Sequence, residues 1–178
     1  MKRDAALICD FVNTCDLEDA VEELGTPAAA RRWFAERSLL ARTARFDDAD
    51  LARVVELREA LRELLFANND GDLDTRAATA VLDRAARRAK VALRFTSGGP
   101  MLDPQAGGVD HALGRILGAV AATMADGSWA RLKACRSEIC RWAFYDGAKN
   151  QSRVWCSMRV CGNREKARTF RKRHARAR

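Results

Sequence analysis

Two short cysteine motifs decide how the last third of the chain folds: CRSEIC at residues 135–140 and CSMRVC at residues 156–161. Each motif has four residues between its cysteines, and 15 residues separate the two motifs. Zinc prefers four ligands in tetrahedral geometry, and thiolates suit it well. Two such pairs separated by roughly 15–20 residues are the usual sequence form of a zinc site. The motifs therefore predict one Zn²⁺ ion held by Cys135, Cys140, Cys156 and Cys161.

The number of ligands indicates what the metal does. Four protein ligands fill a tetrahedral coordination sphere, whereas a catalytic zinc keeps one position open for water. We therefore expect a structural zinc ion that needs neither His111 nor His174 as a ligand. Two disulfides or four free buried thiols are the alternatives, and a reducing compartment argues against the disulfides.

The start of the chain bears on the compartment. Its apolar stretch is ended by Asp10 too soon for a secretory signal. The chain also lacks the run of about eighteen apolar residues that a membrane-spanning helix needs. We therefore expect a cytoplasmic protein, in which cysteine pairs bind metal more often than they form disulfides. Cys9 and Cys15 are expected to be buried, unreactive thiols, with a redox pair as the alternative.

The residues between the cysteine motifs predict a small β-hairpin. RWAFY (141–145) and SRVW (152–155) are strand-like, and an Asp-Gly turn signal follows the first of them. The second motif leads into a helix that begins near Cys161, where the helix dipole favours a thiolate. The first cysteine motif is expected to form a zinc knuckle at 135–140. A knuckle, a hairpin and a helix in this order predict a treble-clef-like zinc finger. Three aromatic residues are expected to form its core, with stacking on nucleic-acid bases as the alternative: Trp142, Phe144 and Trp155.

Charge is divided unevenly along the chain, which has a formal net charge of +8. Residues 131–178 hold 15 Lys and Arg residues and three acidic ones, a net charge of +12, so residues 1–130 carry −4. This asymmetry suggests a polyanion-binding end attached to a body with another task. Basic residues that merely keep a tail in solution are the alternative. The candidate nucleic-acid contacts are Arg153, Arg159, Arg164, Lys166, Arg168, Arg171, Lys172 and Arg173.

The terminal helix also carries a narrow apolar stripe formed by Ala167, Phe170, His174 and Ala177. We expect this stripe to pack on the hairpin of the finger and to leave the basic faces exposed. A module this small has little core of its own, so its stability should depend on the metal. Removing zinc is therefore expected to unfold the last third and abolish polyanion binding, while residues 1–130 stay folded.

Residues 1–130 predict a mostly helical domain with a small β-hairpin, so the fold class of the chain is α+β. Thr26 suits a helix cap and Pro27 the first helical position. Alternating side-chain polarity at 91–96, followed by a Ser-Gly-Gly-Pro turn, predicts the hairpin. The run at 5–14 is too short to assign to helix or strand. Apolar residues at helical spacing predict helices at 26–40, 47–70, 74–90 and 109–125.

The motifs resemble a known bacterial family. WCSM (155–158), CGNR (161–164) and the upstream WAFYD (142–146) are similar to the CGNR zinc finger. DFVNT (10–14) resembles the opening motif of the ABATE domain that usually precedes this finger. The resemblance covers essentially the whole chain. It implies an α+β ligand-sensing domain at 1–130, then a DNA-binding treble-clef finger at 131–178, as in stress-induced transcription regulators.

The chain departs from the family pattern at one visible position. Gly147 follows Asp146 where a Ser or Thr is expected. We expect the glycine to tighten a turn without affecting the metal, since the four cysteines match the family without exception.

These features favour a DNA-binding transcription regulator in which a structural-zinc module presents a basic helix. An RNA- or ribosome-associated zinc protein is the alternative, because phosphate contacts carry no sequence information. A zinc-thiolate redox switch is the third hypothesis. We expect no enzyme, since the sequence has no Gly-rich phosphate loop, nucleophile elbow or carboxylate–histidine cluster.

The expected partner is nucleic acid, with DNA favoured over RNA. The protein is not expected to bind a membrane. A homodimer is left open. Control by a small-molecule effector bound to the N-terminal domain is also left open, and Asp10, Asn13 and Thr14 are the candidate contacts. The alternative for these three residues is that they cap a helix or close a turn.

Overall fold

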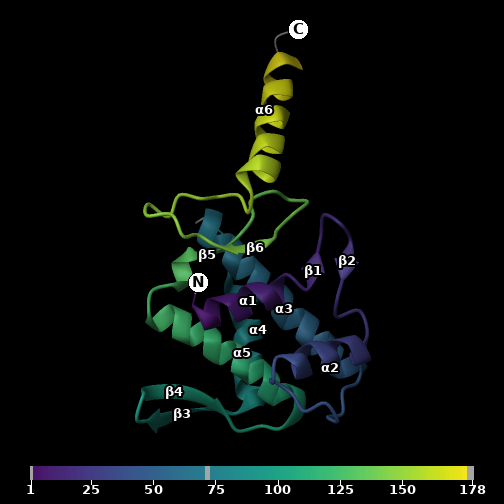
Figure 1. The fold of residues 1–178 in the computed structure, drawn as a ribbon, viewed down its shortest axis with the longest axis vertical. Helices are drawn as coiled ribbons and strands as arrows, with labels where there is room; N and C mark the ends of the chain where they lie inside the picture. The colour runs from purple at the N-terminus through teal and green to yellow at the C-terminus, as the bar shows by residue number, and fades with distance from the viewer. Residues whose placement is uncertain (1, 71–72, 176–178) are drawn as a thin grey trace.

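The N-terminal part of the chain is built mainly from helices that pack around one another (Figure 1). The structure, a computed structural model, describes residues 2–70 and 73–175, with the backbone alone at 70, 172, 173 and 175. The predicted helices are confirmed, with ends shifted by a few residues, and the undecided run at 5–14 is helical. The helices of this part are α1 (Arg3–Val12), α2 (Pro27–Glu36), α3 (Asp48–Asp70), α4 (Arg76–Ala89) and α5 (Gly108–Ala125).

Local sequence explains where these helices begin and what they bury. The Oγ1 atom of Thr26 accepts a hydrogen bond from the backbone N–H of Ala29 at 3.2 Å, which caps α2 as predicted. Helix α3 buries apolar residues that recur at helical spacing, among them Leu57 and Leu61. Within the described part of the chain, no helix is both long and apolar enough to cross a membrane.

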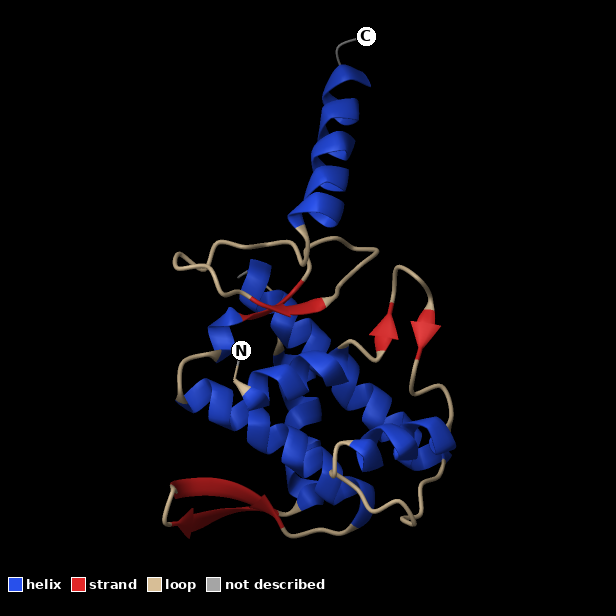
Figure 2. Ribbon diagram, viewed as in Figure 1, coloured by secondary structure: helices blue, strands red, loops and turns tan. Residues whose placement is uncertain are grey.

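Short antiparallel strand pairs flank the helices (Figure 2). β3 (Val91–Thr96) and β4 (Gly99–Pro104) form the predicted hairpin. Its end packs tightly on α5, since a Cβ atom at Gly114 would lie 2.5 Å from the Cβ atom of Pro104. β1 (Cys15–Asp16) and β2 (Val21–Glu22) form a second hairpin. Its strands of two residues are too short to give a sequence signal.

The zinc-finger segment shares the hydrophobic core of the helical part. Helix α5 leads through a 3₁₀ turn, η1 (Trp129–Arg131), into β5 (Leu132–Ala134), which pairs with β6 (Ala143–Tyr145). Leu132, Ala134 and Ala143 belong to the same buried cluster as Phe11 and Ile116. A boundary at residue 131 therefore separates the sequence motifs but does not divide the core.

The hairpin inside the finger differs from the predicted one. Residues 152–155 form no strand, and β6 pairs with β5, which precedes the first cysteine motif. The predicted pairing is wrong because Leu132 and Ala134 bury their side chains in the main core, which fixes β5 beside β6. The first cysteine motif forms the turn between these strands. The first cysteine motif, β6 and α6 still follow one another along the chain in the predicted order.

Helix α6 (Asn163–Ala175) projects away from the rest of the protein (Figure 1). It follows η2 (Met158–Gly162), a π-helical turn. The predicted packing of its apolar stripe on the hairpin is wrong, because Phe170 is 61% exposed. The Phe170 ring contacts His174 instead, with ring centroids 4.0 Å apart. Two alanines and one ring offer too little apolar area to hold the helix down, and Ala177 lies outside the described residues.

Candidate metal centre

The four predicted ligands meet at one point. Their sulfur atoms all lie within 4.8 Å of one another. The Sγ atom of Cys156 lies 3.6 Å from that of Cys140 and 3.7 Å from that of Cys161. Tetrahedral zinc with bonds of about 2.3 Å separates its sulfur ligands by about 3.8 Å. The donor set and its spacing therefore fit one structural zinc ion, held by Cys135, Cys140, Cys156 and Cys161.

Two backbone turns hold the cysteine pairs. Cys135 directly follows β5, and its N–H donates to the carbonyl of Trp142 at 2.9 Å across the knuckle. Cys161 lies in η2, one residue before Gly162. A Cβ atom at Gly162 would lie 2.5 Å from the sulfur of Met158 and 3.2 Å from the Trp155 ring. Glycine at this position therefore allows the turn to close against Met158 and Trp155.

Aromatic side chains surround the sulfur cluster. Trp142 and Trp155 are partly buried and pack against three of the cysteines. Phe144 is buried, and the Arg153 guanidinium lies over its ring at 4.8 Å from the centroid. The prediction that aromatics form the core of the finger is confirmed for Trp142 and Trp155, whereas Phe144 is buried but is not part of this cluster.

The thiols of the cluster influence one another. Hydrogen bonds from Cys140 and Cys156 lower the pKa of the Cys135 thiol. Hydrogen bonds to Cys135 raise the pKa values of Cys140 and Cys156. These opposite shifts arise because neighbouring thiols share hydrogen bonds within the cluster. A zinc ion binds cysteines as thiolates, so its binding releases the remaining protons.

A buried ion pair organises the loop between the two cysteine motifs. The Lys133 Nζ atom donates to the Asp146 carboxylate at 2.9 Å and to the carbonyl of Gln151 at 2.5 Å. The same carboxylate accepts the backbone N–H groups of Ala148 and Arg153 at 3.0 and 2.9 Å. Burial alone would raise the pKa of Asp146, but these hydrogen bonds hold it below its usual value.

Gly147 does not tighten the turn as expected. Its backbone is not left-handed, and a Cβ atom there would meet nothing within 4 Å. The turn is held by the Asp146 carboxylate, so a Ser or Thr would fit at position 147 equally well.

Side chains from α1 and α3 fasten the finger to the helical part. The Asn13 Nδ2 atom donates to the carbonyl of Ala143 at 2.9 Å, and the Ala143 N–H donates to Asn13 Oδ1 at 2.7 Å. Asn69 Nδ2 donates to the carbonyls of Ala134 and Val154, both at 2.8 Å. Each amide therefore bridges a finger strand or its neighbouring loop to the body.

Buried Arg62 on α3 makes a further connection. It donates to the carbonyls of Val12, Cys15 and Arg141 at 2.7, 3.1 and 3.1 Å. Arg141 belongs to the knuckle, and its guanidinium lies over the ring of Phe66, 3.5 Å from the centroid. One arginine of the body thus joins α1, β1 and the zinc knuckle.

Replacing Asn13 by alanine is expected to lower the free energy of unfolding by about 2 kcal/mol, because it leaves the N–H and C=O of Ala143 without their partner. Urea unfolding of the zinc-loaded protein, followed by circular dichroism, measures the change. Asp10→Ala, an exposed change on the same helix, is the matched control and should leave stability unaltered. Equal midpoints for the two variants would show that the Asn13 contact contributes nothing.

The three candidate effector contacts do not lie together. Asn13 is engaged with Ala143, and the Thr14 hydroxyl is buried and donates to the carbonyl of Phe11 at 2.8 Å. Only Asp10 of the three lines a groove of about 850 Å³ between α1, α5 and the β3–β4 hairpin. These contacts support the alternative, in which Asn13 and Thr14 have structural roles. Asp10 remains a candidate effector contact.

The candidate nucleic-acid contacts divide into two groups. Arg153 donates to the carbonyls of Trp155 and Cys156, so it is engaged within the finger. Arg164 pairs with Glu18, and Arg168 pairs with Glu165. Among the described residues, three of the candidates have no ion-pair partner: Arg159, Lys166 and Arg171. The side chains of Lys172 and Arg173 lie outside the described part.

Sequence reasoning missed most of the residues that join the finger to the body. Arg62 and Asn69 are polar residues on a long helix, where they give no distinct signal. Lys133 gives a weak one, because a basic residue between two apolar neighbours, Leu132 and Ala134, is unusual in a buried strand.

Comparison with protein-family models agrees with this architecture. Residues 131–174 match the model of the CGNR zinc finger, and residues 5–127 match the model of ABATE, described as "Putative stress-induced transcription regulator". A search of curated proteins found no significant match. The ABATE model covers more than half of the chain. The chain therefore belongs to the ABATE family and ends in a CGNR zinc finger.

Proposed function

We propose that this regulator binds duplex DNA through η2 and α6, with the zinc ion fixing the root of α6. The observation that carries the proposal is a projecting, strongly basic helix that begins two residues after a metal ligand (Figure 1). Cations that neutralise phosphates release counterions from DNA, and this supplies most of the non-specific affinity. An isolated helix of this length is marginal in water, so an anchored root favours its helical form.

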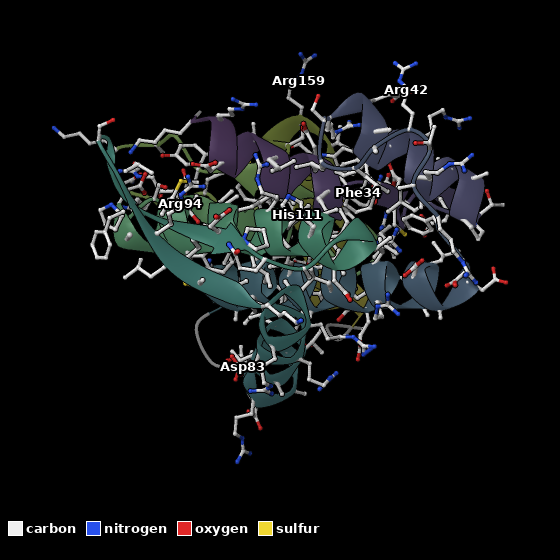
Figure 3. The ribbon with its side chains drawn as sticks, turned by 90° about the horizontal axis from the view of Figure 1, so that it is seen from below. Phe34, Arg42, Asp83, Arg94, His111 and Arg159 are labelled. Carbon is white, nitrogen blue, oxygen red and sulfur yellow. The ribbon has the colours of Figure 1, made fainter. Side chains whose placement is uncertain are left out.

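Three candidate contacts have no ion-pair partner among the described residues, and we call them the free cations: Arg159, Lys166 and Arg171. They are the contacts best suited to phosphate. Arg159 points away from the body into solvent (Figure 3). Lys166 and Arg171 are exposed on α6, five residues apart. A phosphate can approach any of these three without first breaking an ion pair recorded among the described residues. They are therefore expected to dominate the salt dependence of binding.

Substituting Lys166 and Arg171 together by glutamine is expected to weaken duplex binding about tenfold at 0.1 M salt. It should also reduce the slope of log K against log salt by about 1.8, or 0.9 for each lost phosphate contact. A mobility-shift or filter-binding assay over a salt series on random-sequence duplex DNA measures both quantities.

The matched control is the double variant Arg31→Gln and Arg42→Gln, which removes the same charge from exposed positions of the N-terminal domain. Figure 3 labels Arg42, whose side chain extends into solvent. The control should bind DNA within about twofold of the wild type, because at 0.1 M salt charges act over about 10 Å. Failure of the wild type to bind duplex DNA at low salt would refute the proposal. Tighter, competition-resistant binding to structured RNA would favour the RNA alternative.

Effector control is a further part of the proposal. It is supported by the groove of about 850 Å³ beside α1 and α5, which has the volume of a small-molecule site. The groove places Asp10 beside apolar residues of the β3–β4 hairpin such as Leu93 and Leu102. Binding of an effector in this groove would be transmitted to the finger through α1, because Asn13 at the end of α1 bonds to Ala143.

A further inference from the structure

An acidic hairpin of the N-terminal domain lies beside the root of α6. The acidic hairpin is residues 15–23, CDLEDAVEE, which contain five acidic residues and no basic one. It consists of β1, β2 and the loop between them. Asp16, at the end of β1, and the loop residues Glu18 and Asp19 line a hollow of about 310 Å³ together with residues of the finger, among them Cys161 and Val160. The most acidic loop of the body thus adjoins the start of the most basic helix.

One direct contact joins the two. The Nη2 atom of Arg164 lies 2.5 Å from the Oε1 atom of Glu18, across 146 positions of sequence. Arg164 is the first basic residue of α6, and its side chain remains 40% exposed. Exposed ion pairs contribute little to stability, so this contact is a weak means of fixing the helix. It does occupy the guanidinium that a phosphate would otherwise bind.

The acidic hairpin is held in place from behind by buried groups. Glu22 forms a bidentate ion pair with buried Arg58. The Nη1 and Nη2 atoms of Arg58 each donate to one Glu22 carboxylate oxygen at 2.7 Å. The backbone N–H of Glu23 donates to the carbonyl of Thr14 at 2.8 Å. At the tip, the Asp16 carboxylate accepts the N–H groups of Glu18 and Asp19. The position of Glu18 is therefore set before any ligand arrives.

From this geometry we propose that the acidic hairpin is a built-in competitor for phosphate, with Glu18 occupying Arg164 until nucleic acid displaces it. The inference rests on the proposed binding of a polyanion by α6. A phosphate at Arg164 must first break the pair with Glu18. Binding at the root of α6 is thereby weakened, and the free cations, Arg159, Lys166 and Arg171, make the first contacts.

Replacing Glu18 by alanine tests the competition. The variant is expected to bind duplex DNA about fivefold more tightly than the wild type at 0.1 M salt. Its slope of log K against log salt should steepen by about 0.9, because one more phosphate contact forms. The matched control is Glu56→Ala, which removes another carboxylate paired with an arginine at 2.5 Å, between α3 and α4. The control should change affinity by less than about twofold.

A second background shows whether the effect passes through Arg164. In a chain carrying Arg164→Gln, adding Glu18→Ala should leave DNA affinity unchanged. Glu18→Gln, with bound zinc and thermal unfolding measured alongside, serves as a second variant in case alanine disturbs the loop. Equal affinity and equal salt slope for Glu18→Ala and Glu56→Ala would overturn the inference, as would weaker binding of both Glu18 variants with zinc and folding intact.

A heparin column separates failure of this inference from failure of the proposed function. Elution of Glu18→Ala at higher salt than Glu56→Ala would support the competition even if the wild type did not bind duplex DNA. Co-elution of the two variants would overturn it. Binding of the wild type to DNA, measured separately, decides the proposed function.

Discussion

Replacing Asp146 by alanine is expected to lower the free energy of unfolding by about 3–5 kcal/mol, because it leaves the buried Lys133 ammonium without its counter-charge. The Asp146 side chain is fully buried, and its two oxygens accept three hydrogen bonds. Two of these come from backbone N–H groups in the loop that leads to Cys156. The substitution should therefore also weaken zinc retention, measured by competition with a chromophoric chelator.

An exposed pair serves as the control. Asp74 pairs with Arg76 at 2.7 Å, but both side chains are more than half exposed. Asp74→Ala should lower the free energy of unfolding by no more than about 1 kcal/mol, since the exposed pair is screened by water and salt and only one backbone N–H at the start of α4 loses its partner. If Asp146→Ala were as stable as Asp74→Ala, the buried pair would have no structural role.

The pH dependence of Asp146 follows from its lowered pKa. A carboxyl with a folded-state pKa below the unfolded value of about 3.9 stabilises the protein fully above that value. The contribution is lost as the pH falls through the folded pKa. The stability difference between the wild type and Asp146→Asn should therefore be constant near neutral pH and shrink below about pH 4.

The sequence predicted the metal centre well because its information is local. Two motifs with fixed spacing determine which four sulfur atoms can meet, and zinc chemistry determines the geometry. The helices were predicted for a similar reason. Thr26 and Pro27 mark one helix start, and α3 has apolar residues at a regular spacing.

The arrangement of the finger on the body could not be predicted in this way. It depends on single polar residues whose partners lie 79 positions away for Arg62 and 130 for Asn13. No spacing rule applies over such distances. The strand-like pattern of residues 152–155 was misleading, because the Lys133 and Asp146 side chains bind that segment in place of a strand ladder.

Charge counting also gave an incomplete picture of the basic end. It correctly located a surplus of cations, but Arg153, Arg164 and Arg168 are each engaged with other groups of the chain. The cations that remain free of ion pairs among the described residues were not distinguishable from these by type or spacing. Only the fold brings Glu18 next to Arg164.

Removing the zinc ion is expected to abolish DNA binding and to disorder η2, α6 and the loop before them, while β5 and β6 stay on the body. Structural zinc contributes about 10–16 kcal/mol in zinc-finger peptides, far more than the few apolar contacts around the sulfur cluster. The sequence predicted that residues 131–178 unfold as one unit. The structure argues against this, because Leu132, Ala134 and Ala143 are buried in the main core.

Amide hydrogen exchange with and without chelator distinguishes the two outcomes. The N–H groups of Ala143 and Asp146 bond to Asn13 and Arg131, so they should keep their protection without zinc. The N–H groups of Arg136 and Gly162 bond to Val154 and Ser157 around the metal site, and they should lose theirs. Loss of protection at Ala143 together with Gly162 would restore the single-unit model.

Single cysteine variants repeat the experiment without a chelator. Cys140→Ser removes a ligand and should reproduce the exchange pattern and the loss of DNA binding. Cys15→Ser, a change at a partly buried thiol outside the cluster, should retain one zinc ion and normal binding. α6 projects from η2 with little support from the body. If α6 binds DNA as proposed, its basic face can be held in place only while the four sulfur atoms are tied together. DNA affinity that survived in both the chelated protein and Cys140→Ser would mean that the basic tail binds on its own, and that the metal does not anchor the contact.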